Sequence, residues 1–165
     1  DMVFLEPLRD PNVIYVFHFY GPHIFTHQGA SWGPYYWNWL GNLHYPSNAA
    51  NAAQVAETVP EAIDRLYVIR YGADHWDGPR VESEINQAAD WAKRNGVPLV
   101  CNEFGVYRHA QPQDRLAWLK DVRTSLEHHN ISWAMWDYSG SFGVVTKQNG
   151  KNVLDEDTVK ALGLR

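Results

Sequence analysis

Three segments of the chain are apolar or aromatic at nearly every position, and the segments between them mix apolar and polar residues. The three apolar segments cover residues 13–20, 98–104 and 131–138. A strand buried on both faces has this continuous pattern, which is typical of a parallel sheet covered by helices. The pattern therefore predicts three parallel strands.

The segments between the strands carry apolar residues at helical spacing. In residues 80–95, apolar side chains recur three or four positions apart, and Gly96 then favours a helix end because glycine adopts left-handed backbone readily. A second helix is predicted from Pro112 to about residue 126, and a third over residues 156–162. The order strand, helix, strand, helix, strand, helix predicts right-handed βαβ units, an α/β fold.

The connection over residues 21–78 is too long for a simple crossover and must carry structure of its own. Its first part, residues 21–46, sets aromatic residues among Gly, Pro and Asn, which predicts a loop. Long loops in compact domains are usually functional or disordered. The aromatic residues of this loop are Trp32, Tyr35, Tyr36, Trp37, Trp39 and Tyr45.

Composition narrows the classes of partner. The 165 residues suit one domain over 1–165. The eight Trp and nine Tyr indicate either a protein surface whose rings stack on a ligand or a Trp-rich core. A net charge of −5 without a basic stripe argues against nucleic acid and anionic membranes as partners. The single cysteine, Cys101, excludes an internal disulfide, and no apolar run is long enough to cross a bilayer.

Polar and aromatic side chains gather at the C-terminal ends of the predicted strands, where parallel α/β barrels build their active sites. Strict alternation along a strand predicts which side chains share a face. The sets expected to share a face are His18 with Tyr20, Leu99 with Cys101 and Glu103, and Ala134 with Trp136 and Tyr138. A carboxylate that can attack an anomeric carbon, a hydroxyl that can hold it and rings that can stack on a sugar are suited to sugar chemistry.

Each of these residues also has a structural interpretation. Glu103 could belong to an ion pair, His18 and Tyr20 to a hydrogen-bonded core, and Trp136 to core packing. The set His18, His23 and His27 could be a metal cluster, but it lacks a nearby Cys or Asp, so we expect neither a metal nor a cofactor. Glu82 and Glu84 are expected at the start of a helix, where acidic side chains interact favourably with the helix dipole.

The motifs resemble three consecutive strands of glycoside hydrolase family 5. Residues 12–20, Asn-Val-Ile-Tyr-Val-Phe-His-Phe-Tyr, are similar to its sixth strand, with the motif His-x-Tyr. Residues 100–107, Val-Cys-Asn-Glu-Phe-Gly-Val-Tyr, resemble its seventh strand, and residues 132–138, Ser-Trp-Ala-Met-Trp-Asp-Tyr, its eighth. The resemblance covers nearly the whole chain and implies a partial (β/α)8 TIM barrel, equivalent to the last three βα units.

The family consists largely of retaining endo-β-1,4-glucanases and mannanases. The resemblance implies that Glu103 is the nucleophile, that Tyr20 donates a hydrogen bond to it, and that His18 contacts the substrate. Trp136 would stack on the sugar that is cleaved. From the loop composition, we expect at least some of Trp32, Trp37 and Trp39 to line a cleft and bind β-glucan.

The departures from the family concern its other half. The family's general acid/base lies in an Asn-Glu-Pro motif that this sequence lacks, and the Arg of the second strand and the His of the third have no counterparts. Retaining hydrolysis needs two carboxyl groups about 5–5.5 Å apart. We therefore expect activity only with a complementing N-terminal barrel segment or a second copy of the chain.

Three functions remain open from the sequence. The chain is part of a retaining β-1,4-glucanase, a non-catalytic carbohydrate-binding remnant, or a fragment kept for assembly. The exposed sheet edges of a partial barrel predict self-association or pairing with the missing segment. The resemblance to bacterial polysaccharide-degrading enzymes implies a secreted or periplasmic location.

Overall fold

A three-stranded parallel sheet is the framework of the molecule, which a computed structural model describes over residues 4–164. Its strands, in spatial order, are β1 (Tyr15–Phe19), β2 (Leu99–Phe104) and β3 (Ser132–Trp133). The pairing of β1 with β2 and of β2 with β3 is parallel. The prediction of three parallel strands is therefore confirmed.

β3 is shorter than the predicted range of 131–138, yet the chain continues beside β2 beyond its end. The N–H of Ala134 donates to the carbonyl of Cys101 over 2.9 Å, and the N–H of Trp136 donates to the carbonyl of Phe104 over 2.9 Å. These two hydrogen bonds hold residues 134–136 beside β2 after the regular β2–β3 pairing has ended. They place Trp136 next to the C-terminal end of β2.

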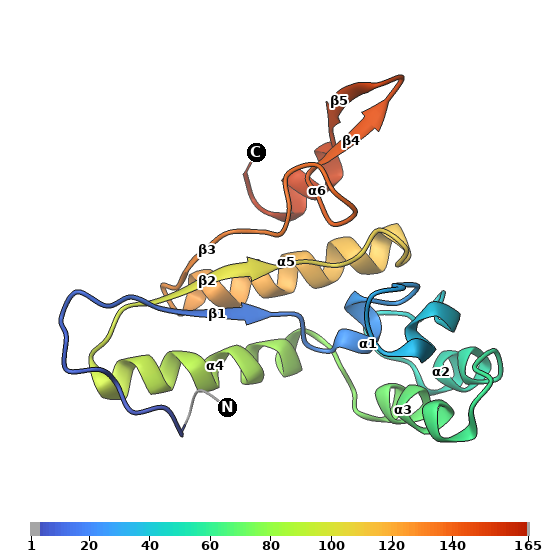
Figure 1. The fold of residues 1–165 in the computed structure, drawn as a ribbon, viewed down its shortest axis with the longest axis horizontal. Helices are drawn as coiled ribbons and strands as arrows, with labels where there is room; N and C mark the ends of the chain where they lie inside the picture. The colour runs from blue at the N-terminus through green and yellow to red at the C-terminus, as the bar shows by residue number, and fades with distance from the viewer. Residues whose placement is uncertain (1–3, 165) are drawn as a thin grey trace.

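Helices lie along the sheet and supply most of its packing (Figure 1). The helices of the predicted βαβ units are α4 (Gly78–Asn95), α5 (Pro112–His128) and α6 (Glu156–Ala161). Tyr15 of β1 packs edge-to-face on Trp91 of α4, with 5.1 Å between ring centroids. Phe19 of β1 stacks on Trp118 of α5 at 5.9 Å. Both tryptophans are buried, so for them the Trp-rich core is the correct interpretation.

The ends of α4 follow from local chemistry. The carboxylate of Asp77 accepts a hydrogen bond from the N–H of Arg80 over 3.0 Å and caps the helix, which starts two residues before the predicted 80. Gly96 ends the helix with φ of 62°, as predicted.

No helix among residues 4–164 is both long enough and apolar enough to span a membrane.

The face of the sheet away from these helices is open to solvent within the described residues. Val16 of β1 is 52% exposed and Trp136 beyond β3 is 50% exposed, whereas Phe17 and Cys101 point the other way into the hydrophobic core. A single three-stranded layer thus has one packed face and one open face. The fold is α/β, and its three-stranded sheet forms only part of a barrel.

The long connection after β1 folds into helices, and a buried amide holds its first part together. Its elements are α1 (His23–Thr26), the 3-10 helix η2 (Tyr35–Trp39), α2 (Ala49–Ala56) and α3 (Ala62–Ala73). Gln28 is fully buried; its amide N–H groups donate to the carbonyls of Phe25 and Leu43, and its oxygen accepts from the N–H of Leu43. Because all these groups are paired, Gln28 fixes the two ends of the loop to each other.

A β-hairpin near the C-terminus was not predicted. Strands β4 (Val145–Gln148) and β5 (Lys151–Leu154) pair antiparallel and project away from the main sheet (Figure 1). Asn149 and Gly150 form the turn with φ of 50° and 75°. An Asn-Gly pair between two short runs is the usual sequence signal for such a turn, so the signal was present.

Candidate active site

Glu103 lies at the C-terminal end of β2, on the open face of the sheet. The register along β1 and β2 pairs Phe17 with Cys101 and then His18 with Glu103, so Asn102 is an extra residue in the ladder. This β-bulge reverses the alternation, and the prediction that Leu99, Cys101 and Glu103 share a face is wrong. Cys101 is buried against the helices, whereas Glu103 faces the opposite side with His18. Bulges re-aim side chains beside active sites in this way.

Two side chains hold the Glu103 carboxylate: His18 of β1, and Tyr20, the residue that follows β1. The Tyr20 hydroxyl donates to Oε1 over 2.6 Å, and Nδ1 of His18 lies 3.5 Å from Oε2. Burial, together with the hydrogen bond to Glu103, raises the pKa of the Tyr20 phenol, so it keeps its proton and remains a donor. The three residues that the sequence placed in one site are therefore in contact.

A layer of rings behind Tyr20 fixes its position. The ring of His27 lies 5.0 Å from that of Tyr20 and 5.0 Å from that of Trp37, and His23 stacks on His27 at 5.3 Å. The Thr26 hydroxyl donates to the Tyr20 carbonyl over 2.8 Å. Burial, with a smaller effect of His23, lowers the pKa of His27 to about 4. A neutral His27 therefore belongs to the support of Tyr20, a role that the sequence did not indicate.

Trp136 and Trp32 are the predicted tryptophans that are exposed near this end of the sheet. Trp136 is half exposed and is joined to the strand of Glu103 by its backbone hydrogen bond to Phe104. Trp32, 57% exposed, lies within 6.4 Å of Phe142, whose ring is 6.1 Å from that of Tyr20. Both indoles are thus exposed near the C-terminal ends of the strands, without a direct contact with the carboxylate among the hydrogen bonds and ring contacts of residues 4–164.

The structure places the other two loop tryptophans differently. Trp37 is only 8% exposed and packs on His23 and His27, so its ring is part of the core rather than of an open cleft. Trp39 is exposed, but it contacts Tyr35, and its carbonyl accepts a hydrogen bond from Thr58, after α2. No hydrogen bond, ion pair or ring contact between described residues joins Trp39 to the surroundings of Glu103.

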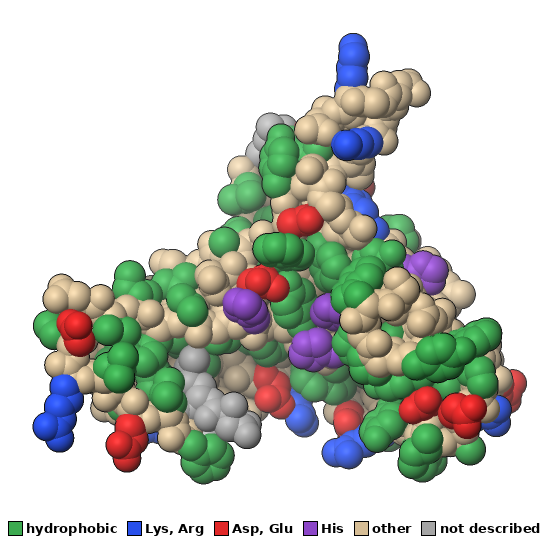
Figure 2. Space-filling model, viewed as in Figure 1, with side chains coloured by type: hydrophobic (Ala, Val, Ile, Leu, Met, Phe, Trp, Pro, Cys, Tyr) green, Lys and Arg blue, Asp and Glu red, His purple; other side chains and the backbone are tan. Residues whose placement is uncertain are grey.

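A partner carboxylate for Glu103 is not among its contacts within residues 4–164. Asp137 follows Trp136, but its Oδ1 accepts a hydrogen bond from the N–H of Gly140 over 3.0 Å and closes the turn after β3. On the face seen in Figure 2, histidine side chains lie with acidic and hydrophobic side chains near the middle of the molecule, over the ends of the strands. The described site can hold and orient one carboxylate and present rings to a ligand.

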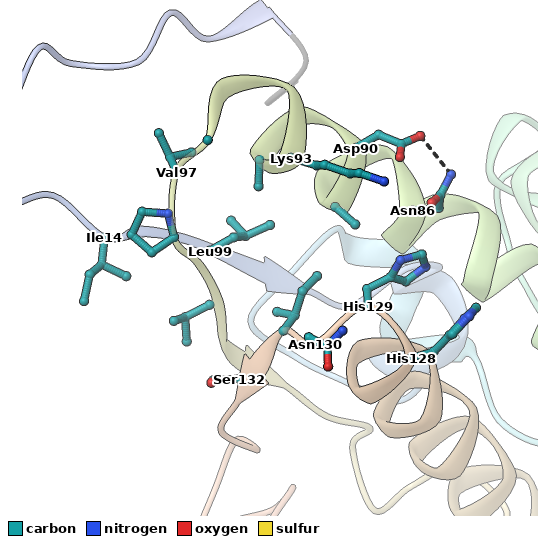
Figure 3. Close-up of a pocket in the computed structure, with 16 residues that line it drawn as sticks. Ile14, Asn86, Asp90, Lys93, Val97, Leu99, His128, His129, Asn130 and Ser132 are labelled. Carbon is teal, nitrogen blue, oxygen red and sulfur yellow. Dashed lines mark hydrogen bonds between the residues drawn. The ribbon is translucent and has the colours of Figure 1, made fainter. Parts of the chain in front are cut away.

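A separate cavity of about 830 Å³ opens at the other end of the strands (Figure 3). Its lining comes from the starts of β2 and β3, from the C-terminal half of α4 and from the end of α5 with the residues after it, including Leu99, Ser132, His128 and His129. Glu103 ends β2, so this cavity does not belong to its site. Active sites of parallel α/β barrels lie at the opposite, C-terminal face.

Comparisons with known proteins agree with the geometry. The family model for cellulase, glycosyl hydrolase family 5, matches residues 1–141. Endoglucanase 3 of Fibrobacter succinogenes is 33% identical over 96% of this chain and 24% of its own length. Endoglucanase C of Acetivibrio thermocellus is 24% identical over 92% of this chain and 43% of its own length.

A solved structure shows the same arrangement of elements. Thermotoga maritima Cel5A in complex with cellobiose superposes with a TM-score of 0.69 and 26% identity, over 96% of this chain and 42% of that chain. The chain thus spans less than half the length of the relatives that it matches. With a family match over most of its length, the chain belongs to the cellulase family, glycosyl hydrolase family 5.

Proposed function

We propose that this chain supplies the nucleophile half of a retaining β-1,4-glucanase site. The observation that carries the proposal is the Glu103 carboxylate, held by the Tyr20 hydroxyl at 2.6 Å on the open face of a barrel sheet. Relatives named endoglucanase support glucan as the substrate. In this proposal residues 1–165 form one unit, the last three βα units, with β1, β2 and β3 as the sixth, seventh and eighth strands.

The geometry suits a two-step displacement. Tyr20 occupies Oε1 of Glu103, which leaves Oε2 to attack the anomeric carbon, with His18 beside it for a sugar hydroxyl. The new bond from Glu103 to carbon forms as the bond from carbon to the leaving oxygen breaks, and that oxygen needs a proton from a second carboxyl group. Water then cleaves the glycosyl ester and restores the carboxylate.

The proton donor must come from a residue other than Tyr20 and His18, the side chains that contact Glu103 within residues 4–164. We propose that a complementing segment with the earlier barrel strands supplies it, because the chain spans less than half the length of its relatives. A second copy of the chain is the other possible source. Polymeric glucan does not enter cells, so we propose that the enzyme acts outside the bacterial cytoplasm.

Labelling with a 2-fluoro cellobioside that carries an activated leaving group tests the nucleophile directly. Such a leaving group departs without a proton, so a covalent ester forms even when the acid is absent. We expect mass spectrometry to find the label on Glu103, both in the chain alone and in the chain combined with the N-terminal segment of Endoglucanase 3.

The matched variants are Glu103→Gln and Glu84→Gln. Glu103→Gln should abolish labelling and lower turnover of carboxymethyl cellulose by the complemented chain by several orders of magnitude, since the covalent route is lost. Glu84 pairs with Arg80 on α4, so Glu84→Gln should label and turn over normally. Labelling of another residue, or turnover by Glu103→Gln close to that of the unmodified chain, would contradict the proposal.

A second function, glycan binding without turnover, is favoured by one observation. Within residues 4–164 the Glu103 carboxylate contacts Tyr20 and His18 and no second acid, while Trp136 and Trp32 keep open faces. Binding of cello-oligosaccharides by the complemented chain, with no release of reducing ends, would select this function over hydrolysis.

A further inference from the structure

Two histidines at the end of α5 converge on one carboxylate of α4. Nδ1 of His128 and Nε2 of His129 each lie 2.8 Å from Oε1 of Glu82. Potential ligand atoms of these three residues all lie within 4.8 Å of one another. The cluster is separate from Glu103 and plays no part in the proposed hydrolysis.

The end of α5 brings the two consecutive histidines together. In a continuing helix, neighbouring side chains point about 100° apart. His129 is the C-cap residue with φ of −89° and ψ of 6°, so the chain leaves helical geometry there, and the two ring centroids are 4.9 Å apart. Figure 3 shows both rings leaving the end of α5 on the side of α4.

We propose that Glu82, His128 and His129 form a binding site for a zinc-class divalent metal ion. Two imidazole nitrogens and one carboxylate oxygen are a known zinc ligand set, with metal–ligand bonds of about 2.0–2.2 Å. Tetrahedral bonds of that length place ligand atoms about 3.3 Å apart. The two nitrogens lie 2.8 Å from Oε1 of Glu82, and all three ligand atoms lie within 4.8 Å of one another, which is close to this spacing.

The surroundings favour a cation with an open coordination position. The C-terminal end of a helix carries partial negative charge, and both histidines sit at that end of α5. The His128 side chain is 70% exposed and His129 is more enclosed, and both line the 830 Å³ cavity. A metal ion there is reachable from solvent and can take water as its remaining ligand.

The site would join α4 to α5, which pack on the same sheet. A metal ion held by both helices stabilises the folded chain by mass action, because the unfolded chain does not present the three ligands together. We expect zinc to raise the melting temperature and a chelator to reverse the rise.

Titration of the purified protein with zinc, and with cobalt as a spectroscopic probe, tests the site. We expect one ion per chain and the visible absorption of tetrahedral cobalt. Glu82→Gln, His128→Ala and His129→Ala should each weaken binding at least about tenfold, since loss of a residue that only hydrogen-bonds a metal ligand already costs that much. Each variant should also lose the cobalt spectrum.

His44→Ala is the matched control, because His44 forms the same kind of pair with one carboxylate, Asp114, over 2.7 Å. It should bind zinc as the unmodified protein does. Absence of zinc binding, or binding that all three cluster variants keep, would overturn the proposal. Circular dichroism of each variant separates loss of the site from loss of the fold.

Discussion

His27 links the support of the active site to the pH dependence of stability. Its pKa is about 4 in the folded chain, lowered by burial and by His23, and about 6.5 when unfolded. Between these values the unfolded chain binds a proton that the folded chain does not, so the free energy of unfolding falls as the pH is lowered. A single such group contributes up to about 1.4 kcal/mol per pH unit.

We therefore expect His27→Gln to flatten the pH dependence of stability between pH 6.5 and 4. Urea unfolding at several pH values across this window measures the slope. His109→Gln replaces an exposed histidine and should keep the slope of the unmodified chain. Equal slopes for all three proteins would contradict the buried, neutral state of His27.

We expect opposite effects on ligand binding and on stability when Trp136 and Trp37 are each replaced. Trp136→Ala removes a half-exposed ring three residues beyond β3, so oligosaccharide binding by the complemented chain should weaken while stability changes little. Trp37→Ala empties a core position and should cost about 3–5 kcal/mol of stability. Isothermal titration and thermal unfolding of both variants check this, and equal effects on the two properties would contradict the assignment.

The contacts of single residues show how far the sequence predicts the site. His18, Tyr20 and Glu103 meet as expected, because each belongs to a motif at the end of a strand. Burial of Trp37 and the support by His27 depend on how the loop folds back on itself, which its composition does not specify. The Glu82 cluster joins residues 46 positions apart, outside any local pattern.

At the scale of elements, long apolar patterns predict strands and helices well, whereas a bulge of a single residue cannot be recognised from the sequence. The strands follow from apolar segments of seven or eight residues, and the two long helices from 18 and 17 residues of helical spacing, so one exception does not change them. The bulge at Asn102 depends on one extra residue, yet it decides which face Glu103 occupies. The helices α2 and α3 lie in a connection whose need for structure was predicted, but not its kind.

Gly72 sets the distance between α2 and α3. A Cβ at this position would lie 2.9 Å from the backbone Cα of Ala49 and 3.1 Å from the carbonyl oxygen of Asn48. Gly72→Ala should therefore cost about 1–3 kcal/mol, although alanine is the better helix former, because overpacking against backbone forces the helices apart.

Gly96→Ala is the control for Gly72→Ala. Gly96 has φ of 62° and nothing within 4 Å of an added Cβ, so its cost comes from backbone conformation alone, about 1 kcal/mol. Chemical denaturation of both variants measures the difference, and hydrogen exchange locates it. A Gly72→Ala variant as stable as the unmodified chain would show that α2 and α3 are not packed this closely.

At the scale of the whole molecule, the face of the three-stranded sheet away from α4 and α5 is not covered by any other layer within residues 4–164. Ile14 and Val16 are exposed there, and the edges of β1 and β3 have no neighbouring strand within residues 4–164. In a complete barrel, side chains from eight strands fill the interior on this face. Apolar side chains on such a face and unpaired strand edges favour association with another chain.

We therefore expect the isolated chain to self-associate and the complementing barrel segment to displace that association. Val16→Lys should reduce self-association, because it puts a charge on the open face, while stability changes little since the side chain is already 52% exposed. Leu66→Lys, at an exposed position of α3 away from the sheet, should leave association unchanged. Light scattering measures the mass of each protein, and unfolding curves check the fold. A stable monomer that unfolds cooperatively, or equal effects of both lysine variants, would show that the open sheet face does not drive assembly.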